Sequence, residues 1–365
     1  MIFISCIVLG AVLKLTAAVI LPFTVAAMLA MIVYPIVRLM AKVKVPKAIS
    51  ITLSAIIVIA GMYLICIILY SAGKQIMSVY PKYENRLVEI YRYLGRFLEL
   101  SYNEDLNFAD NLWGQLGIRT WFRGFALSFS NITINFLKNA FLAVLFMVFL
   151  LVEAGSFKTK LEVAFADTSS RILKVLNDIV HQISRYIVAK FFISIAQGSL
   201  FVIFLKLIHV EFAVLWGLLQ FITNFIPTLG GIVNGIFVSV FALIQFWPNP
   251  TPVILVVIMV LLVNNTIGSV LDPKIVGDRV GISALVVLIS LMIWGWIWGF
   301  TGMILAVPMT VTIRIVCENI PFLEPVSILL GTRKAVLAKK AMMEKKEGDK
   351  EAVEPSPDIG APEQQ

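Results

Sequence analysis

Charged side chains are scarce in this sequence. Asp, Glu, Lys and Arg make up 14% of the 365 residues, whereas 59% of the residues are hydrophobic. A soluble domain carries about a quarter charged residues. A water-soluble globule of this size could not hide so much apolar surface, and the apolar residues come in long uncharged blocks rather than in amphipathic stretches. The sequence therefore predicts an all-α polytopic integral membrane protein.

Residue patterns for metal, cofactor or catalytic chemistry are also missing. The three cysteines, Cys6, Cys66 and Cys317, lie far apart in apolar surroundings, and His181 and His209 are lone histidines. No P-loop, HExxH or GxSxG signature occurs, and no paired acid and base stands at a recognisable spacing. We therefore expect no metal site, no cofactor and no enzyme activity, and no transport driven by ATP hydrolysis on this chain.

The basic residues are placed as membrane topology requires. The formal net charge of +8 could suggest a nucleic-acid partner, but Lys and Arg cluster at the ends of apolar blocks and in the C-terminal tail. Short loops rich in Lys and Arg stay in the cytoplasm, which assigns the connector from Arg38 to Lys47 and the stretch 154–185 to that side. We predict a multi-pass protein of the bacterial cytoplasmic (inner) membrane with both termini in the cytoplasm, and no nucleic-acid partner.

Long apolar blocks indicate the membrane segments. A spanning helix needs about 20 apolar residues. Uninterrupted blocks of this kind lie at about 1–20, 22–40, 48–73, 132–153, 186–208 and 253–271, with a chain turn expected at Pro22 between the first two. Two further apolar blocks, 212–247 and 282–320, are interrupted by Gly and Pro, and the second is uncharged as far as residue 313. Depending on whether each interrupted block returns or crosses twice, we expect about 6 to 10 hydrophobic membrane segments.

Polar composition divides the chain into four parts. Residues 1–73 are expected to form the N-terminal membrane segments. Residues 74–131 carry charges of both signs with apolar residues at helical spacing, which predicts an extramembrane insert of amphipathic helix. Residues 132–332 are the main membrane domain with the broken helices. Residues 333–365 are charged and rich in Pro and Glu, which predicts a disordered cytoplasmic tail.

Helix-breaking residues interrupt two uncharged blocks at membrane depth, at 225–231 and at 299–302. A break in hydrocarbon must face protein or a watery cavity, because every backbone polar group there needs a partner. Many secondary transporters bind solutes at such half-helix ends. The predicted substrate pathway consists of Asn224, Pro227, Thr228, Gly230, Gly231, Asn234, Asn264, Asn265, Gly299, Gly302 and Pro308. Alternatively, these Asn and Thr residues join helices by hydrogen bonds and these glycines allow close helix packing.

Two acids border the late uncharged blocks. Asp272 and Asp278 lie in a short charged loop between them. An acid beside a membrane cavity can carry a proton or a cation, whereas one at the membrane interface only sets orientation. We therefore keep Asp272 and Asp278 as candidate ion-coupling residues.

Three stretches of sequence carry a resemblance to a known family. They are Asn224 to Gly231, the N-terminal elements Leu21 to Phe23 and Tyr34 to Val37, and the run Asp272 to Gly277, Val280 to Val287 and Trp298 to Pro308. In these stretches and in their order the chain resembles the autoinducer-2 exporter (AI-2E) family of PerM-like permeases over roughly residues 15–330. Many members carry an acid where this chain has Ile267, whose side chain cannot exchange a proton.

The resemblance implies a transporter that exports small molecules, with the quorum-sensing signal autoinducer-2 as the namesake substrate. The leading hypothesis is a secondary permease for a small polar solute, because breaks lined by Asn and Thr suit a neutral ligand. The first alternative is a monovalent cation (Na⁺ or Li⁺)/H⁺ antiporter that uses Asp272 and Asp278. The second is a non-transporting oligomeric membrane scaffold with the helix at 74–100 as its partner-binding arm, which leaves a homo-oligomer open.

Overall fold

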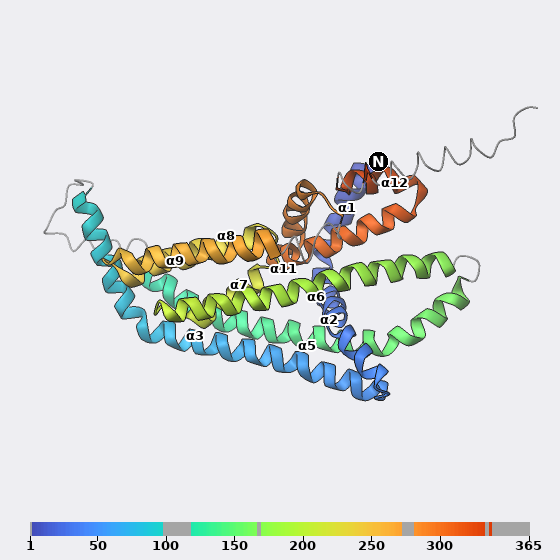
Figure 1. The fold of residues 1–365 in the computed structure, drawn as a ribbon, viewed down its shortest axis with the longest axis horizontal. Coiled ribbons are helices and arrows are strands. Elements are labelled where there is room, and N and C mark those ends of the chain that lie inside the picture. The colour runs from blue at the N-terminus through green and yellow to red at the C-terminus, as the bar shows by residue number, and fades with distance from the viewer. Residues whose placement is uncertain (1, 98–117, 166–168, 272–280, 333–335, 338–365) are drawn as a thin grey trace, which may run out of the picture.

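The chain forms a bundle of long helices (Figure 1). The computed structural model describes residues 2–97, 118–165, 169–271, 281–332 and 336–337, and this part of the chain contains no β-strand. Its helices are α1 (Ile2–Leu15), α2 (Ala17–Lys42), α3 (Lys47–Phe97), α5 (Ile118–Ala164), α6 (Ser169–Leu207), α7 (Ala213–Thr223), α8 (Leu229–Phe246), α9 (Pro250–Val263), the π-helix Asn264–Leu271, α11 (Ala284–Asn319), the 3₁₀ turn Pro321–Leu323 and α12 (Glu324–Leu330).

Length and composition of these helices confirm the membrane fold. In the described ranges, seven helices are long and apolar enough to cross a bilayer. Large apolar side chains lie exposed on the surfaces of these helices; Phe141 is 70% exposed and Met292 is 76% exposed. By contrast, the polar residues Gln197 and Gln220 are almost fully buried. Exposed apolar patches of this kind are unfavourable in water but match a hydrocarbon environment. The prediction of an all-α polytopic membrane protein is confirmed.

The N-terminal turn lies earlier than the sequence suggested. The chain turns at Thr16, and α2 continues through Pro22 and Pro35. A proline inside a membrane helix is tolerated where neighbouring helices pack around it, and Pro22 is buried. The expected spans 1–20 and 22–40 are therefore wrong: α1 has 14 residues, whereas α2 has 26 and is long enough to cross.

The helix α3 joins a membrane span to the predicted insert. It has 51 residues and continues without interruption past residue 73, for a length of about 77 Å at 1.5 Å per residue. Its first part, Lys47 to Ile76, is a candidate span, and its second part continues as helix to Phe97 within the predicted insert. Residues 98–117 of the insert and most of the predicted tail lie outside the described residues.

The first interrupted block forms a helical hairpin, which we call the first hairpin: α7, the tip Asn224–Thr228, and α8. The two helices lie side by side. The centre of the Phe241 ring in α8 is 5.5 Å from the centre of the Trp216 ring in α7, and it is also 5.5 Å from the centre of the Phe212 ring, just before α7. The hairpin therefore begins and ends at the same end of the molecule.

The second interrupted block is also a hairpin, which we call the second hairpin. The helix α11 is broken at Trp298 and Gly299, whose φ/ψ angles are not helical. Its two halves fold back on each other, since a Cβ at Gly281, just before the first half, would lie 2.1 Å from Arg314 Nη1 in the second half. Each interrupted block thus returns to the end of the molecule at which it begins.

The two hairpins meet at their tips. Ile226, at the tip of the first hairpin, belongs to one buried apolar cluster with Trp294, Ile297 and Trp298 of the second hairpin. The cluster also packs against residues of α1 and α2, including Leu13 and Ile20. The open end of the first hairpin lies towards the far part of α3, while α12 and the turn between α2 and α3 lie towards the opposite end of the molecule (Figure 1).

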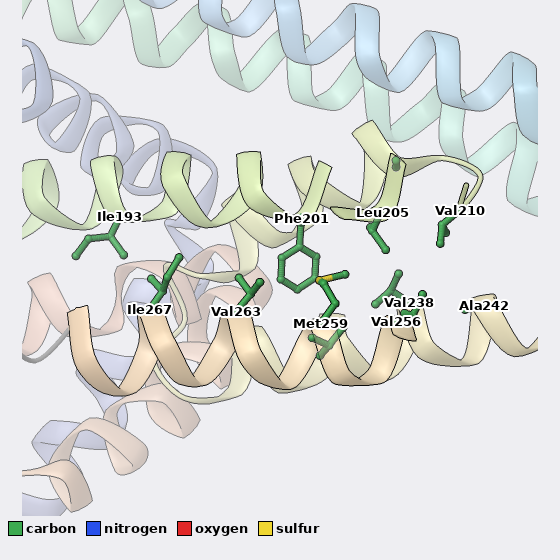
Figure 2. Packing of buried hydrophobic residues seen from close by; sticks show 12 residues of the cluster. Ile193, Phe201, Leu205, Val210, Val238, Ala242, Val256, Met259, Val263 and Ile267 are labelled. Carbon is green, nitrogen blue, oxygen red and sulfur yellow. The ribbon is translucent and has the colours of Figure 1, made fainter. Parts of the chain in front are cut away.

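The helix α6 runs alongside both hairpins. Ile183, Tyr186 and Ile187 pack with Val307 and Val311 of the second hairpin. Further along α6, Ile193, Phe201 and Leu205 pack with residues of α8 and α9, as Figure 2 shows. Consecutive parts of one helix therefore support the two hairpins.

These returns predict a labelling pattern. In a variant whose three native cysteines are replaced by alanine, single cysteines at Lys206 and Asn249 should react with a membrane-impermeant maleimide from one side of the membrane. Single cysteines at Lys44 and Glu318 should react from the other side, because the second hairpin opens towards the turn between α2 and α3. Reaction of Lys206→Cys and Asn249→Cys from different sides would contradict the return of the first hairpin.

Candidate functional site

The tip of the first hairpin reverses the chain within five residues. The amide of Ile226 donates to Thr223 O at 2.8 Å, and the amide of Gly230 donates to Ile226 O at 3.2 Å. Thr228 has φ +61°, and its hydroxyl donates to Pro227 O at 2.7 Å. A Cβ at Gly230 would lie 1.8 Å from Thr223 O. The close approach of the two helices therefore requires glycine at position 230.

The tip of the second hairpin is built on the same principle. Gly299 has φ +61° and ψ −143°, a conformation that L side chains rarely adopt. A Cβ at Gly302 would lie 1.9 Å from Trp294 O. At both tips a residue of positive φ is thus followed by a glycine that packs against a carbonyl of the preceding helix.

A network of four amide side chains lies next to the first tip. Gln197 Nε2 of α6 donates to Asn264 Oδ1 at 2.8 Å, and Gln220 Nε2 of α7 donates to the same oxygen at 3.2 Å. Asn234 Nδ2 of α8 donates to Gln220 Oε1 at 2.7 Å. Asn264 Nδ2 donates to the backbone oxygen of Gly231 at 2.9 Å. We call these four residues the amide network; it joins α6, both helices of the first hairpin and the end of α9.

Asn264 is the first residue of the π-helix that follows α9. π-helical turns are rare and occur frequently at functional sites. Asn264 is partly buried in the amide network, whereas the neighbouring Asn265 is exposed on the outside of the bundle. Only one of the two adjacent asparagines therefore contributes to the site.

Buried polar residues also occupy one face of α6. Lys190, Ser194 and Gln197 are 3%, 0% and 2% exposed, and their spacing of four and three residues places them on the same side of the helix. Ser194 Oγ accepts a hydrogen bond from Asn224 Nδ2 of the first tip at 3.0 Å. Lys190 comes between the part of α6 that packs on the second hairpin and the part that packs on the first. Ionisable residues inside membrane segments commonly mark solute or ion pathways.

The structure brings some of the predicted pathway residues together and separates others. Asn224, Gly231, Asn234 and Asn264 meet at the amide network or next to it, and Gly230 lies at the same tip. Pro227 and Thr228 form the tip itself, and Thr228 is exposed. Gly299 and Gly302 lie at the second tip, and Pro308 is buried further along the second hairpin. Asp272 and Asp278 lie outside the described residues.

Sequence reasoning missed three members of the site. Lys190, Gln197 and Gln220 were not singled out, although each is an isolated polar residue within an apolar stretch. The predicted site contained only residues at or near the helix breaks, whereas these three residues lie in regular helix. Ile267, where the family resemblance raised the question of an acid, is 5% exposed and faces Ile193 in the apolar packing (Figure 2).

Polar contacts beyond the candidate span of α3 attach the second part of this helix to the open end of the first hairpin. Lys82 Nζ lies 2.5 Å from Glu211 Oε1, and the Tyr83 hydroxyl donates to Glu211 Oε2 at 2.6 Å. Arg86 donates to Trp247 O at 2.8 Å and to Gln245 O. The amide of Glu211 donates to Gln245 Oε1 at 2.8 Å. We call this group the arm clasp.

The arm clasp changes the pKa values of its acids. Burial alone would raise the pKa of Glu211, but hydrogen bonds from Lys82 and Tyr83 and the charges of Lys82 and Arg86 outweigh it and lower the pKa. Burial raises the pKa of Tyr83, and the hydrogen bond to Glu211 adds to this effect. Glu211 is therefore ionised and Tyr83 neutral at physiological pH.

Neither the site nor its surroundings indicate a metal centre. The described part of the chain holds no group of three His, Cys, Asp or Glu residues that could bind a metal ion. The members of the amide network offer only neutral amide groups. Their chemistry suits hydrogen bonding to a polar molecule, because each amide supplies both donors and an acceptor.

Known proteins of similar sequence carry the names of transport proteins. The family model described as "AI-2E family transporter" matches residues 2–322 of the chain. The "Putative transport protein" of Borreliella burgdorferi is 32% identical over 321 residues, which cover 87% of this chain and 86% of that protein. The "AI-2 transport protein TqsA" of Escherichia coli is 28% identical over 333 residues, which cover 87% of this chain and 91% of that protein.

The glycines at the two tips lead to a prediction about stability. The substitutions Gly230→Ala and Gly302→Ala should lower the melting temperature of the purified protein, because a new Cβ would overlap a backbone oxygen at each tip. Overpacking of this kind costs about 1 to 3 kcal/mol. Gly61→Ala in α3 is the control, since its Cβ would meet nothing within 4 Å. Equal melting temperatures for all three variants would contradict the close approach at the tips.

The lowered pKa of Glu211 leads to a prediction about pH. The arm clasp should stay closed at pH values above 4.5, the ordinary pKa of Glu. It should open as the pH falls through the lowered pKa that Glu211 has in the folded protein. Spin labels at Glu89 and Asn249 should show a narrow distance distribution at pH 7 that broadens in acid. Glu211→Gln should be broad already at pH 7, although the partly exposed pair is worth only about 1 kcal/mol.

The matched control is Glu153→Gln, which removes a second acid that forms an ion pair with a lysine, Lys160. That variant should keep the narrow distribution at pH 7. A narrow distribution for Glu211→Gln would show that Glu211 does not hold the clasp.

Proposed function

Because this chain belongs to the AI-2E transporter family, we propose that it is a secondary permease that exports a small, neutral, polar solute. The name of the similar protein TqsA suggests autoinducer-2, or a solute like it, as the cargo. The proposed pathway runs between the tips of the first and second hairpins and past the amide network. The observation that carries this proposal is the meeting of two oppositely directed hairpins next to the four hydrogen-bonded amides of the network.

Two returning hairpins can supply the two gates that alternating access needs. Both ends of a hairpin lie on one side of the membrane, so displacement of its tip opens a route towards that side without moving the helices that cross. Ile226 and Trp298 lie in one apolar cluster, which closes the route between the tips. A solute held near the amide network would reach one side when the first tip moves and the other side when the second tip moves.

The basic residues support an orientation for this pathway. Lys42, Lys44 and Lys47 cluster at the turn between α2 and α3, and the Lys47 ammonium donates to Val152 O of α5 at 2.8 Å. Segments rich in Lys and Arg stay in the cytoplasm. In this orientation the second hairpin opens to the cytoplasm, and the first hairpin and the arm clasp face the outside of the cell.

The chemistry of the site favours a neutral solute over a cation. The network presents amide groups, two of which point N–H donors at the same oxygen of Asn264. Buried Lys190 lies two helical turns from Gln197 on the same face of α6. A bare monovalent cation would need oxygen ligands and a compensating negative charge in this environment.

Flux through reconstituted vesicles tests the proposal. We expect gradient-dependent movement of autoinducer-2 or another neutral polar solute, and at least about a tenfold loss in Asn264→Leu, which removes three hydrogen bonds of the network. Phe141→Leu, on the lipid-facing surface of α5, is the control and should transport normally. Failure of every neutral solute, together with Na⁺- or Li⁺-dependent proton flux that Asp272→Asn or Asp278→Asn abolishes, would replace the permease with an antiporter.

A further inference from the structure

The amide network has a fixed direction. The backbone oxygen of Gly231 can only accept a hydrogen bond, so Asn264 must turn its NH₂ group towards Gly231. Asn264 Oδ1 then faces α6 and α7, and Gln197 and Gln220 must both turn their NH₂ groups towards it. One carbonyl at the first tip therefore determines how the amides of three helices are oriented, without the usual ambiguity of Asn and Gln flips.

This direction leaves one acceptor unused. Gln197 Oε1 is buried, and no donor among the described residues reaches it. A flip of the Gln197 amide by half a turn would exchange the positions of Oε1 and Nε2. Gln197 Oε1 would then lie against Asn264 Oδ1, where two acceptors would face each other without a proton between them. Buried polar atoms in proteins nearly always have a hydrogen-bond partner. The side chain is 2% exposed, so this acceptor can be satisfied only by a molecule that enters the bundle.

We propose that Gln197 Oε1 is the anchoring acceptor of a solute subsite and binds a hydroxyl group of a neutral, hydroxylated small molecule. This inference rests on the proposed function, because it deepens the description of the same pathway. It assigns a donor group on the ligand, whereas the proposed function requires only a polar cargo.

The surrounding groups decide which ligand chemistry fits the subsite. Asn264 Oδ1 accepts two hydrogen bonds and Gln220 Oε1 accepts one, whereas Gln197 Oε1 accepts none from the described residues. Na⁺ and Li⁺ need several oxygen ligands, whereas a hydroxyl group needs one acceptor in line with its O–H bond. Ser194, one turn away on the same face of α6, adds a hydroxyl that can exchange hydrogen bonds with a second hydroxyl of the ligand.

The first hairpin controls access to this subsite. Gly231 and Asn234 belong to it, and Gln220 lies in its first helix. Movement of its tip would break the bond between Asn264 and Gly231 and release the amides that bury Gln197. A ligand that bonds to Gln197 Oε1 replaces part of the lost hydrogen bonding, which couples solute binding to the movement of the hairpin.

The substitution Gln197→Leu separates binding from stability. Leu removes the unused acceptor and one of the two N–H groups that share Asn264 Oδ1, while Gln220 still donates to that oxygen. Replacement of a polar group by an apolar one of similar shape can be nearly neutral for stability when its partner stays satisfied. Gln197→Leu should therefore fold normally and lose the ligand. Gln182→Leu, at an exposed position of the same helix, is the matched control.

Equilibrium binding to the purified full chain in lipid nanodiscs tests the inference. The probes are glycerol, erythritol and D-ribose, each compared with its fully O-methylated derivative, which keeps the ether oxygens but donates no hydrogen bond. The wild-type chain should bind at least one hydroxylated probe about tenfold or more tightly than its methylated derivative, which corresponds to about 1.4 kcal/mol. The same probe should bind to Gln197→Leu at least about tenfold more weakly than to Gln182→Leu. Comparison of these two variants corrects for the general stabilisation of proteins by polyols.

Three binding results would overturn the inference: no preference for any hydroxylated probe, equal binding by Gln197→Leu and Gln182→Leu, or binding of LiCl that depends on Gln197. If Gln197→Leu does not fold, the comparison of probe pairs on the wild-type chain decides alone. Vesicle flux that persists with an unchanged KM in Gln197→Leu would also overturn this inference, but it would be consistent with the proposed permease. Binding that depends on Gln197, without flux of any solute, would contradict the proposed permease but would support the subsite.

Discussion

The pairing of backbone N–H and C=O groups in a medium without water is the constraint on which this structure depends. A helix satisfies these groups internally, so each interruption of a helix at membrane depth needs a separate solution. Both hairpins reach the same solution. The chain reverses at a residue of positive φ, Thr228 or Gly299, and the second helix starts with a glycine that packs directly against a carbonyl of the first. The tips are thereby compact enough to meet inside the bundle.

Buried amides extend this pairing from the backbone to the side chains. The backbone oxygen of Gly231 orients Asn264, and Asn264 orients Gln197 and Gln220. Because the four amides come from α6, both helices of the first hairpin and the π-helix after α9, a shift of one element changes the hydrogen bonding of the others. A partly satisfied buried network of this kind is costly unless a ligand completes it. This links the local geometry of one tip to the proposed binding of a solute.

The two ends of the first hairpin are stabilised differently. Its tip lies in an uncharged environment of amides and aromatic rings, whereas its open end is held by charged groups of the arm clasp. The clasp joins the long helix α3 to the segments around Glu211 and Trp247, so α3 braces the open end of the hairpin. The helix α6 supports the hairpin along its length through the apolar packing around Phe201 (Figure 2).

The sequence by itself determined the membrane class, the helical content and the positions of both breaks. These features follow from local composition: uncharged stretches of sufficient length must be helical in lipid, and Pro227, Gly230, Gly299 and Gly302 interrupt them. The turn at Thr16 could not be read in the same way, since Pro22 is the stronger helix breaker and only its packing in the bundle allows α2 to continue through it.

Only the tertiary structure decided that both broken blocks return, that their tips meet, and that Gln197, Gln220 and Lys190 belong to the site. Each of these three residues lies in regular helix, and nothing in its neighbouring sequence distinguishes a polar side chain that faces a partner helix from one at the membrane surface. Burial and hydrogen bonding join residues from α6 to α9, such as Gln197 and Asn264, which are 67 positions apart. Their grouping in space is a property of helix packing, and the local sequence does not reveal it.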